Sequence, residues 1–131
     1  MVQEITEFSE NVSNEKLETD LEKYLVLAKE LGATDAVRIS TDFIIVDERV
    51  KAKCYSPRCP YYGTNLNCPP QFDWDLEQTI KIISKYKYGV FIMLQVPPEE
   101  QTGKNYDSNK HSIPGARKMY EIVAKVQSAA L

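Results

Sequence analysis

The apolar positions near the N-terminus predict a long amphipathic helix. Between Leu17 and Leu31 they recur every three or four residues, which is the spacing of one helical face. Ser13 or Asn14 can cap the start of this helix, and Gly32 is placed to end it. The expected buried face consists of Leu17, Leu21, Tyr24, Leu25, Ala28 and Leu31.

Three short runs with the composition of β-strands follow this helix. They cover residues 35–39, 43–46 and 49–54, and polar turn residues separate them. In the third run apolar residues alternate with Lys51 and Lys53, as in a strand that has one solvated face. The pattern predicts a small meander whose last strand leads into a segment rich in cysteine and proline.

A second helix and an apolar strand are predicted farther along the chain. The helix covers residues 73–86 with Asp73 as its cap. Its buried stripe consists of Leu76, Ile80 and Ile83. The strand covers residues 90–96 and is strongly apolar, which is typical of a strand that is buried on both faces. The order of strand, helix and strand predicts a crossover connection with parallel pairing.

A polar connection and a last helix complete the predicted fold. Residues 97–112 show no periodicity, and the helix is predicted to begin near Ser112 with Pro114 in its first turn. Its apolar positions are Ala116, Met119, Tyr120, Val123, Val126 and Ala130. These elements predict an α/β or α+β fold, with a small mixed β-sheet flanked by about three helices and an irregular Cys/Pro-rich loop. We expect a single domain over residues 1–131, in which residues 1–12 form a loose lead-in.

The composition narrows the class of protein. Of the 131 residues, 43% are hydrophobic and 27% are charged, which is ordinary for a soluble globular domain. The longest apolar run, residues 90–94, is too short to cross a bilayer, and the N-terminus has no basic segment followed by an apolar one. We therefore expect a cytoplasmic protein with no membrane partner.

The net charge of −3 is divided unevenly along the chain. Residues 1–48 carry a charge of −8, and residues 49–131 carry +5. The basic residues nearest the cysteines are Arg49, Lys51, Lys53 and Arg58. They are consistent with an ordinary solvated surface, with a nucleic-acid site, or with compensation for an anionic metal unit. Because they supply at most about four phosphate contacts, tight binding of nucleic acid is not expected.

The cysteines indicate a metal site. Cys54, Cys59 and Cys68 fall within fifteen residues, and the rest of the chain has none. Disulfides are improbable in a chain without a secretory signal, whereas free structural thiols remain an alternative. Ligation of a metal accounts best for the clustering, because thiolates bind zinc and iron–sulfur clusters. Four prolines and Gly63 in the same segment exclude regular structure and let three sulfurs converge.

The cysteine motif as a whole favours an iron–sulfur cluster, expected as a 4Fe-4S cluster, over zinc. A proline directly follows both Cys59 and Cys68, as at the end of bacterial ferredoxin ligand runs. The spacing, four residues and then eight, departs from those ferredoxins and also differs from the two-residue knuckles of zinc ribbons. Both metals normally take four ligands. The fourth could come from His111, Asp73, a group beyond Leu131, another chain, water or substrate.

The string Cys54…Cys59-Pro60-Tyr61-Tyr62-Gly63…Cys68-Pro69-Pro70 resembles the signature of a known family. The family is domain of unknown function 2284, predicted metal-binding proteins common in archaea and anaerobic bacteria. The resemblance covers roughly residues 15–131. It implies a bound metal, most consistent with a cluster, and it assigns no reaction. Similar proteins continue into a second cysteine-rich segment, and the last helix has no stop signal, so we expect the chain to be truncated.

These observations predict an iron–sulfur protein with a role in electron transfer or redox maturation beside a larger redox enzyme. A zinc-stabilised module that binds nucleic acid or protein is one alternative, and an enzyme with an open iron site is another. If a further segment normally covers the last helix, an apolar stripe should be exposed near its end and lead to self-association. The expected stripe consists of Val126, Ala130 and Leu131.

Overall fold

The computed structural model describes residues 12–101 and 114–131, and these form the α+β fold that the sequence predicts. The elements follow one another in the order α1 (Asn14–Glu30), β1 (Asp35–Ser40), the 3-10 turn η1 (Thr41–Phe43), α2 (Glu48–Ala52), α3 (Leu76–Ile83), β2 (Tyr88–Met93), α4 (Pro98–Gln101) and α5 (Pro114–Ala130). Three predicted features lie outside the described residues: the lead-in up to residue 11, the candidate ligand His111, and the helix start at Ser112.

The two strands form an antiparallel sheet. Ser40 at the end of β1 lies opposite Tyr88 at the start of β2, and Asp35 lies opposite Met93. The chain between the strands therefore leaves the sheet and returns to it at the same end, which is the geometry of antiparallel pairing. The predicted parallel crossover is wrong for this reason.

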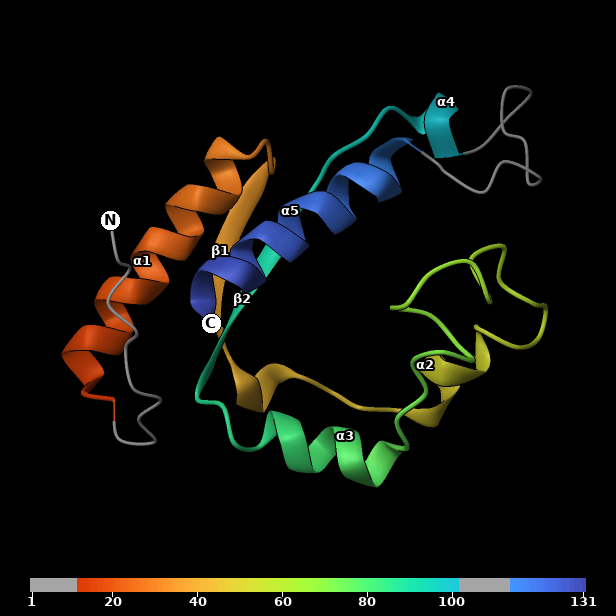
Figure 1. Cartoon of the computed structure of the whole chain (residues 1–131), viewed down its shortest axis with the longest axis horizontal. Helices are drawn as coiled ribbons and strands as arrows, with labels where there is room; N and C mark the ends of the chain where they lie inside the picture. Colours follow the sequence, from red (N-terminus) through yellow and green to blue (C-terminus); the bar gives the residue numbers. More distant parts are fainter. Residues whose placement is uncertain (1–11, 102–113) are drawn as a thin grey trace, which may run out of the picture.

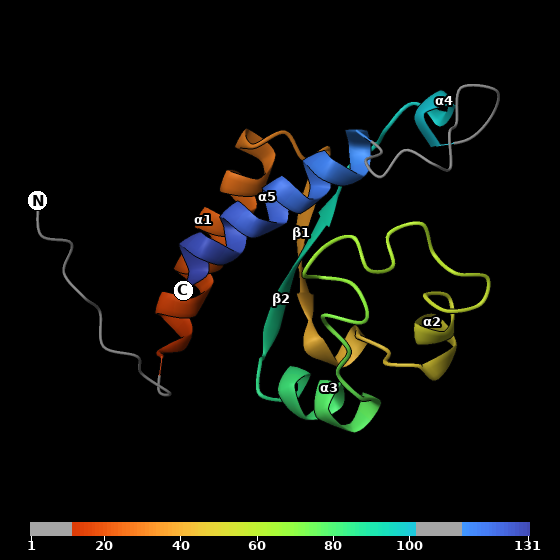
Figure 2. The ribbon, with the colours of Figure 1, turned by 45° about the vertical axis from the view of Figure 1, so that its right-hand side comes forward.

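The core lies between one face of the sheet and a layer formed by α1 and α5. These helices run beside one another across the strands in both views (Figure 1 and Figure 2). The buried cluster consists of Ala28, Ala33, Ala36, Ile122 and Val126. Because three of these residues are alanines, α1 and β1 approach each other closely, and the larger side chains of this cluster come from α5.

The first helix forms where the sequence predicts it. The side chain of Ser13 accepts a hydrogen bond from the backbone N–H of Lys16 at 3.2 Å and so caps α1. Leu21 and Ala28 on the predicted face are buried. Gly32 follows the helix with a φ of 106°, a conformation that side-chain-bearing residues rarely adopt, so it ends the helix as predicted.

The buried stripe of α5 differs from the predicted one. Ile122 is 1% exposed and is the largest fully buried side chain, although the predicted stripe omits it. Tyr120, which the prediction places on the apolar face, is 40% exposed. Val126, the first member of the stripe that we expected to find exposed, lies in the core, whereas Ala130 and Leu131 are exposed.

The second face of the sheet is open to solvent. Phe91 is 50% exposed, and Val37 and Met93 are each 38% exposed. The prediction that residues 90–96 are buried on both faces is therefore wrong. The reason is that the helical layer of α1 and α5 covers only the face on which Ala36 lies.

The segment between the strands is more helical than predicted. Residues 49–54 were predicted as a strand, but Asp47 accepts a hydrogen bond from the backbone N–H of Arg49 at 2.8 Å and caps α2. Residues 44–47 have no regular structure, so the second predicted strand is also wrong. The predicted helix over residues 73–86 is shortened to α3, and its Ile80 is 51% exposed. Because only two strands pair in the described part of the chain, the sheet is too narrow to cover these residues.

Candidate metal-binding loop

The three cysteines lie on one irregular loop between α2 and α3, which runs from Cys54 to Phe72 (Figure 1). The backbone N–H of Cys59 donates to the carbonyl oxygen of Cys54 at 3.2 Å. The backbone N–H of Gly63, whose φ is 74°, donates to the carbonyl oxygen of Pro69 at 2.7 Å. The loop therefore folds back on itself and satisfies part of its backbone internally, as a segment without regular structure must.

The sulfur of Cys68 is contacted by polar groups from two parts of the chain. Nδ2 of Asn65 donates a hydrogen bond to this sulfur at 3.3 Å. The hydroxyl oxygen of Tyr120, on α5, lies 3.9 Å from the same sulfur. Donors beside a sulfur stabilise negative charge on it and tune a metal that it binds. The sulfur of Cys68 thus lies beside an amide donor and a hydroxyl group.

Cys59 lies in the same neighbourhood. Burial raises the pKa of Tyr120, and the contact with Cys68 raises it further. The negative charges of Cys68, Tyr61 and Cys59 act in the same direction. Cys68 contacts the hydroxyl of Tyr120 directly, and Cys59 acts on it electrostatically.

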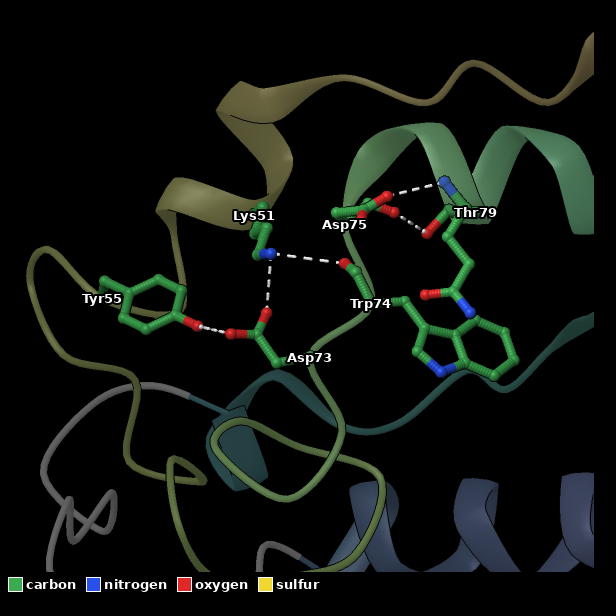
Figure 3. A network of polar contacts seen from close by, with 7 residues as sticks. Lys51, Tyr55, Asp73, Trp74, Asp75 and Thr79 are labelled. Carbon is green, nitrogen blue, oxygen red and sulfur yellow. Dashed lines mark hydrogen bonds and ion pairs between the residues drawn. The ribbon is translucent and has the colours of Figure 1, made fainter.

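The two ends of the loop are joined by Lys51, Tyr55 and Asp73, which we call the loop clamp (Figure 3). Oδ1 of Asp73 pairs with Nζ of Lys51 at 2.7 Å, and the hydroxyl of Tyr55 donates to Oδ2 of Asp73 at 2.7 Å. Lys51 also donates to the carbonyl oxygen of Trp74 at 3.3 Å. Lys51 and then Tyr55 lower the pKa of Asp73, while the hydrogen bond to Asp73 and desolvation raise the pKa of Tyr55 to about 12.

Asp73 does not cap the following helix, contrary to the prediction. Asp75 caps α3, because its Oδ1 accepts a hydrogen bond from the backbone N–H of Gln78 at 2.7 Å. Its carbonyl oxygen also accepts from the hydroxyl of Thr79 at 2.8 Å. Both carboxylate oxygens of Asp73 are engaged in the clamp, which disfavours Asp73 as the fourth metal ligand.

Aromatic rings cover parts of the loop. The rings of Tyr55 and Tyr62 meet edge to face with centroids 5.6 Å apart, and the guanidinium of Arg58 lies 4.6 Å from the centroid of Tyr62. At the other end, the rings of Phe72 and Trp74 are 4.7 Å apart. The rings of Tyr55 and Tyr62 thus pack within the loop, which leaves them less available to stack on the bases of a nucleic acid.

The chemistry of the donor set fits a thiolate-bound metal. Cys54, Cys59 and Cys68 are free thiols and each is half-buried. Among the residues that the structure describes, no three side chains of His, Cys, Asp or Glu are gathered closely enough to hold a metal ion. Binding at these cysteines therefore requires the loop to draw its sulfurs together. His111, another candidate for the fourth ligand, lies outside the described part of the chain.

Asn65 and Tyr120 were missed by the sequence prediction of the site. Periodicity counts the ring of Tyr120 as apolar and carries no information about its hydroxyl. Its contact with Cys68 spans 52 positions, so no local pattern indicates it. Asn65 stands three residues before Cys68, and an amide so close to a predicted ligand is the one signal that was available.

The comparison with protein families agrees with the chemistry of this loop. A family model described as predicted metal-binding protein, domain of unknown function 2284, matches residues 37–131. The matched part contains the three cysteines, the loop clamp and α5. The comparison with curated proteins found no match, and neither did the comparison with solved structures. Because the family model covers more than half of the chain, this chain belongs to the family of predicted metal-binding proteins designated domain of unknown function 2284.

Proposed function

We propose that the chain binds an iron–sulfur cluster, of the 4Fe-4S type, through the thiolates of Cys54, Cys59 and Cys68. The observation that carries this proposal is the placing of three half-buried free thiols on one loop, with Asn65 and Tyr120 beside the sulfur of Cys68. Hydrogen bonds to cysteine sulfur are one of the means by which proteins set the potential of such clusters.

The choice of a cluster over zinc is supported by the prolines beside two of the ligands and by a spacing that is unlike that of zinc ribbons, although it departs from that of bacterial ferredoxins as well. Cys54 and Cys59 are separated by four residues, and Cys59 and Cys68 by eight, which differs from the two-residue knuckles of zinc ribbons. Pro60 and Pro69 directly follow two of the cysteines. Each removes a backbone donor and stiffens the approach of the chain to the sulfur.

The role that we propose is electron transfer or redox maturation beside a larger redox enzyme. A bound cluster would supply one-electron chemistry. The chain's own residues would hold it, and Asn65 and Tyr120 would act on its potential through the sulfur of Cys68. The sulfurs are half-buried, so a partner protein could approach the site without opening the helical core.

A zinc-stabilised module that binds nucleic acid is the second candidate, and the basic residues near the loop give it limited support. Arg49 is paired with Asp47 at 2.6 Å, and Lys51 belongs to the loop clamp. Arg58 lies over the ring of Tyr62. Because these cations already have intramolecular partners, they offer few free charges to phosphates.

We also propose a cytoplasmic location. Thiols that bind a cluster persist in a reducing compartment, and the three cysteines of the chain are free. In residues 12–101 and 114–131 no helix combines the length and the apolar character that a membrane span needs.

Anaerobic purification followed by iron, sulfide and zinc analysis tests the proposal. The reconstituted wild-type protein should show an absorbance shoulder near about 400 nm that is lost on reduction. Cys54→Ser, Cys59→Ser and Cys68→Ser should each lower the cluster content. Ser56→Ala, in the same loop, is the matched control and should retain wild-type cluster content.

The metal analysis has three outcomes that would contradict the proposal in different ways. Zinc without iron or sulfide, lost in the three cysteine variants, would replace the cluster with the zinc module. Wild-type protein that holds none of these metals would refute the proposal. Cluster content unchanged in the cysteine variants would place the ligands elsewhere in the chain.

A further inference from the structure

The loop clamp joins the ends of the cysteine loop independently of any metal. Tyr55 follows Cys54 directly, and Asp73 stands where the loop ends. Their hydrogen bond of 2.7 Å connects positions that are 18 residues apart. Cys59 and Cys68 lie between these two positions, and Cys54 directly precedes the first of them. The clamp therefore closes the segment that carries the three cysteines.

A metal bound by the three thiolates would close the same segment a second time. Bringing the ends of a flexible segment together costs conformational entropy that rises with its length. Where a contact already joins the ends, ligand binding loses less free energy to ordering. A contact that closes a segment can therefore affect ligand affinity without touching the ligand.

We propose that Asp73 is a positioning residue for the metal site: through Tyr55 and Lys51 it holds the cysteine loop in a closed form that favours metal binding. This inference rests on the proposed function of the three cysteines. Asp73 is distinct from its neighbour Asp75, whose carboxylate binds the start of α3 (Figure 3). Asp75 therefore caps the helix, and Asp73 joins the ends of the loop.

The clamp is partly exposed to solvent, and this exposure makes it possible to distinguish a positioning role of Asp73 from a role in the stability of the whole fold. The side chains of Lys51 and Asp73 are 36% and 37% exposed. Exposed ion pairs contribute little to the stability of a whole fold. Removing Asp73 should therefore leave the packing of α1, α5 and the sheet intact and change the loop alone.

The affinity for Co²⁺ alone, measured by chelator competition on the full chain under anaerobic conditions, tests the role of Asp73. Asp73→Ala is expected to bind Co²⁺ between about three- and tenfold more weakly than wild type, with the same number of bound thiolates in its absorption spectrum. Tyr55→Phe should show part of this loss. The double variant should bind no more weakly than Asp73→Ala, because the two residues act as one unit. Asp75→Ala is the control and should keep wild-type affinity.

Hydrogen exchange of the metal-free protein provides a second readout. In Asp73→Ala the amides of residues 54–72 should exchange faster than in wild type, while those of α1 and α5 keep their rates. If wild type binds Co²⁺ and Asp73→Ala binds it equally well, or if exchange in the loop is unchanged, the positioning role is overturned. If wild type binds neither Co²⁺ nor a reconstituted cluster, it is the proposed function that fails.

Discussion

The sulfur of Cys68 lies 3.9 Å from the hydroxyl oxygen of Tyr120, although 52 positions separate the two residues. Tyr120 is on α5, the helix that contributes Ile122 and Val126 to the core. The contact therefore connects the irregular cysteine loop to the packed helical layer. It also brings a hydroxyl beside a proposed metal ligand, where it acts on the electrostatics of the sulfur.

Replacing Tyr120 by phenylalanine isolates the effect of this hydroxyl. Tyr120→Phe keeps the ring but removes the O–H group, which would stabilise the more negative, reduced state of the proposed cluster. We expect the reduction potential of the reconstituted protein to fall by an amount on the order of tens of millivolts. Tyr86→Phe, on the segment that follows α3, is the control and should leave the potential unchanged. Equal potentials in wild type and Tyr120→Phe would exclude a contribution of the hydroxyl.

Asp75→Ala should lower the stability of the protein, because it removes the cap of α3. The backbone N–H of Gln78 would lose its partner, which typically costs about 0.5–2 kcal/mol. Asp75→Asn keeps an oxygen that can accept this hydrogen bond and should be close to wild type. Urea unfolding of the three proteins measures the difference. If Asp75→Ala unfolds at the same urea concentration as wild type, the capping role assigned here is wrong.

The parts of the fold that depend on neighbouring residues could be predicted from the sequence. Ser13 caps α1 and Gly32 ends it, and both functions need only a hydroxyl or a missing Cβ at the right position. The apolar stripe between them repeats often enough to define a helical face. The strand predicted over residues 35–39 also forms, as β1 (Asp35–Ser40).

The parts that depend on distant contacts could not be predicted. One wrong prediction has a local cause instead: residues 49–54 alternate in polarity like a strand, but the alternation is short and the side chain of Asp47 caps α2. The apolar character of β2 suggests burial on both faces, whereas Phe91 is half-exposed because only one face has a helical layer. Periodicity indicates which residues are apolar, and the number of layers that cover them is a tertiary property.

The same division applies to the candidate site. Cys54, Cys59 and Cys68 can be named from their spacing, since ligands of one metal tend to cluster in the sequence. The groups that hold the cysteine loop cannot be named in this way. Asp73 contacts Tyr55 across 18 positions, and only the folded chain brings these two residues together. Ligand candidates are thus readable from the sequence, while the groups that orient them require the structure.

Ile122→Ala should destabilise the fold more than any exposed substitution of the same kind. Ile122 of α5 is 1% exposed and packs against α1 and the sheet, and loss of such a side chain typically costs about 2–5 kcal/mol. Ile45→Ala is the matched control, because Ile45 is 84% exposed and its loss should change stability by about 0.5 kcal/mol or less. Thermal or urea unfolding of both variants measures the contrast. Comparable losses in the two would contradict the position of the core.

The loop clamp should open in acid. Lys51 and Tyr55 hold the pKa of Asp73 below its ordinary value of 3.8. A carboxylate whose pKa is lowered in the folded protein contributes fully above the ordinary value, and the contribution is lost as the pH falls through the lowered pKa. Trp74 is the single tryptophan of the chain, and its carbonyl oxygen accepts a hydrogen bond from Lys51, so its fluorescence reports on the clamp.

A pH titration of Trp74 fluorescence in metal-free protein distinguishes the clamp from other carboxylates. Wild type should show a change below pH 3.8, and Asp73→Asn should lack it, because an amide does not titrate. Asp35 also has a lowered pKa, through the backbone N–H of Ala36 and the side chain of Lys29, but these partners lie in another part of the fold. Asp35→Asn should therefore keep the wild-type change. If the change persists in Asp73→Asn and disappears in Asp35→Asn, the fluorescence follows loosening of the sheet and α1, and the acid-sensitive clamp is refuted.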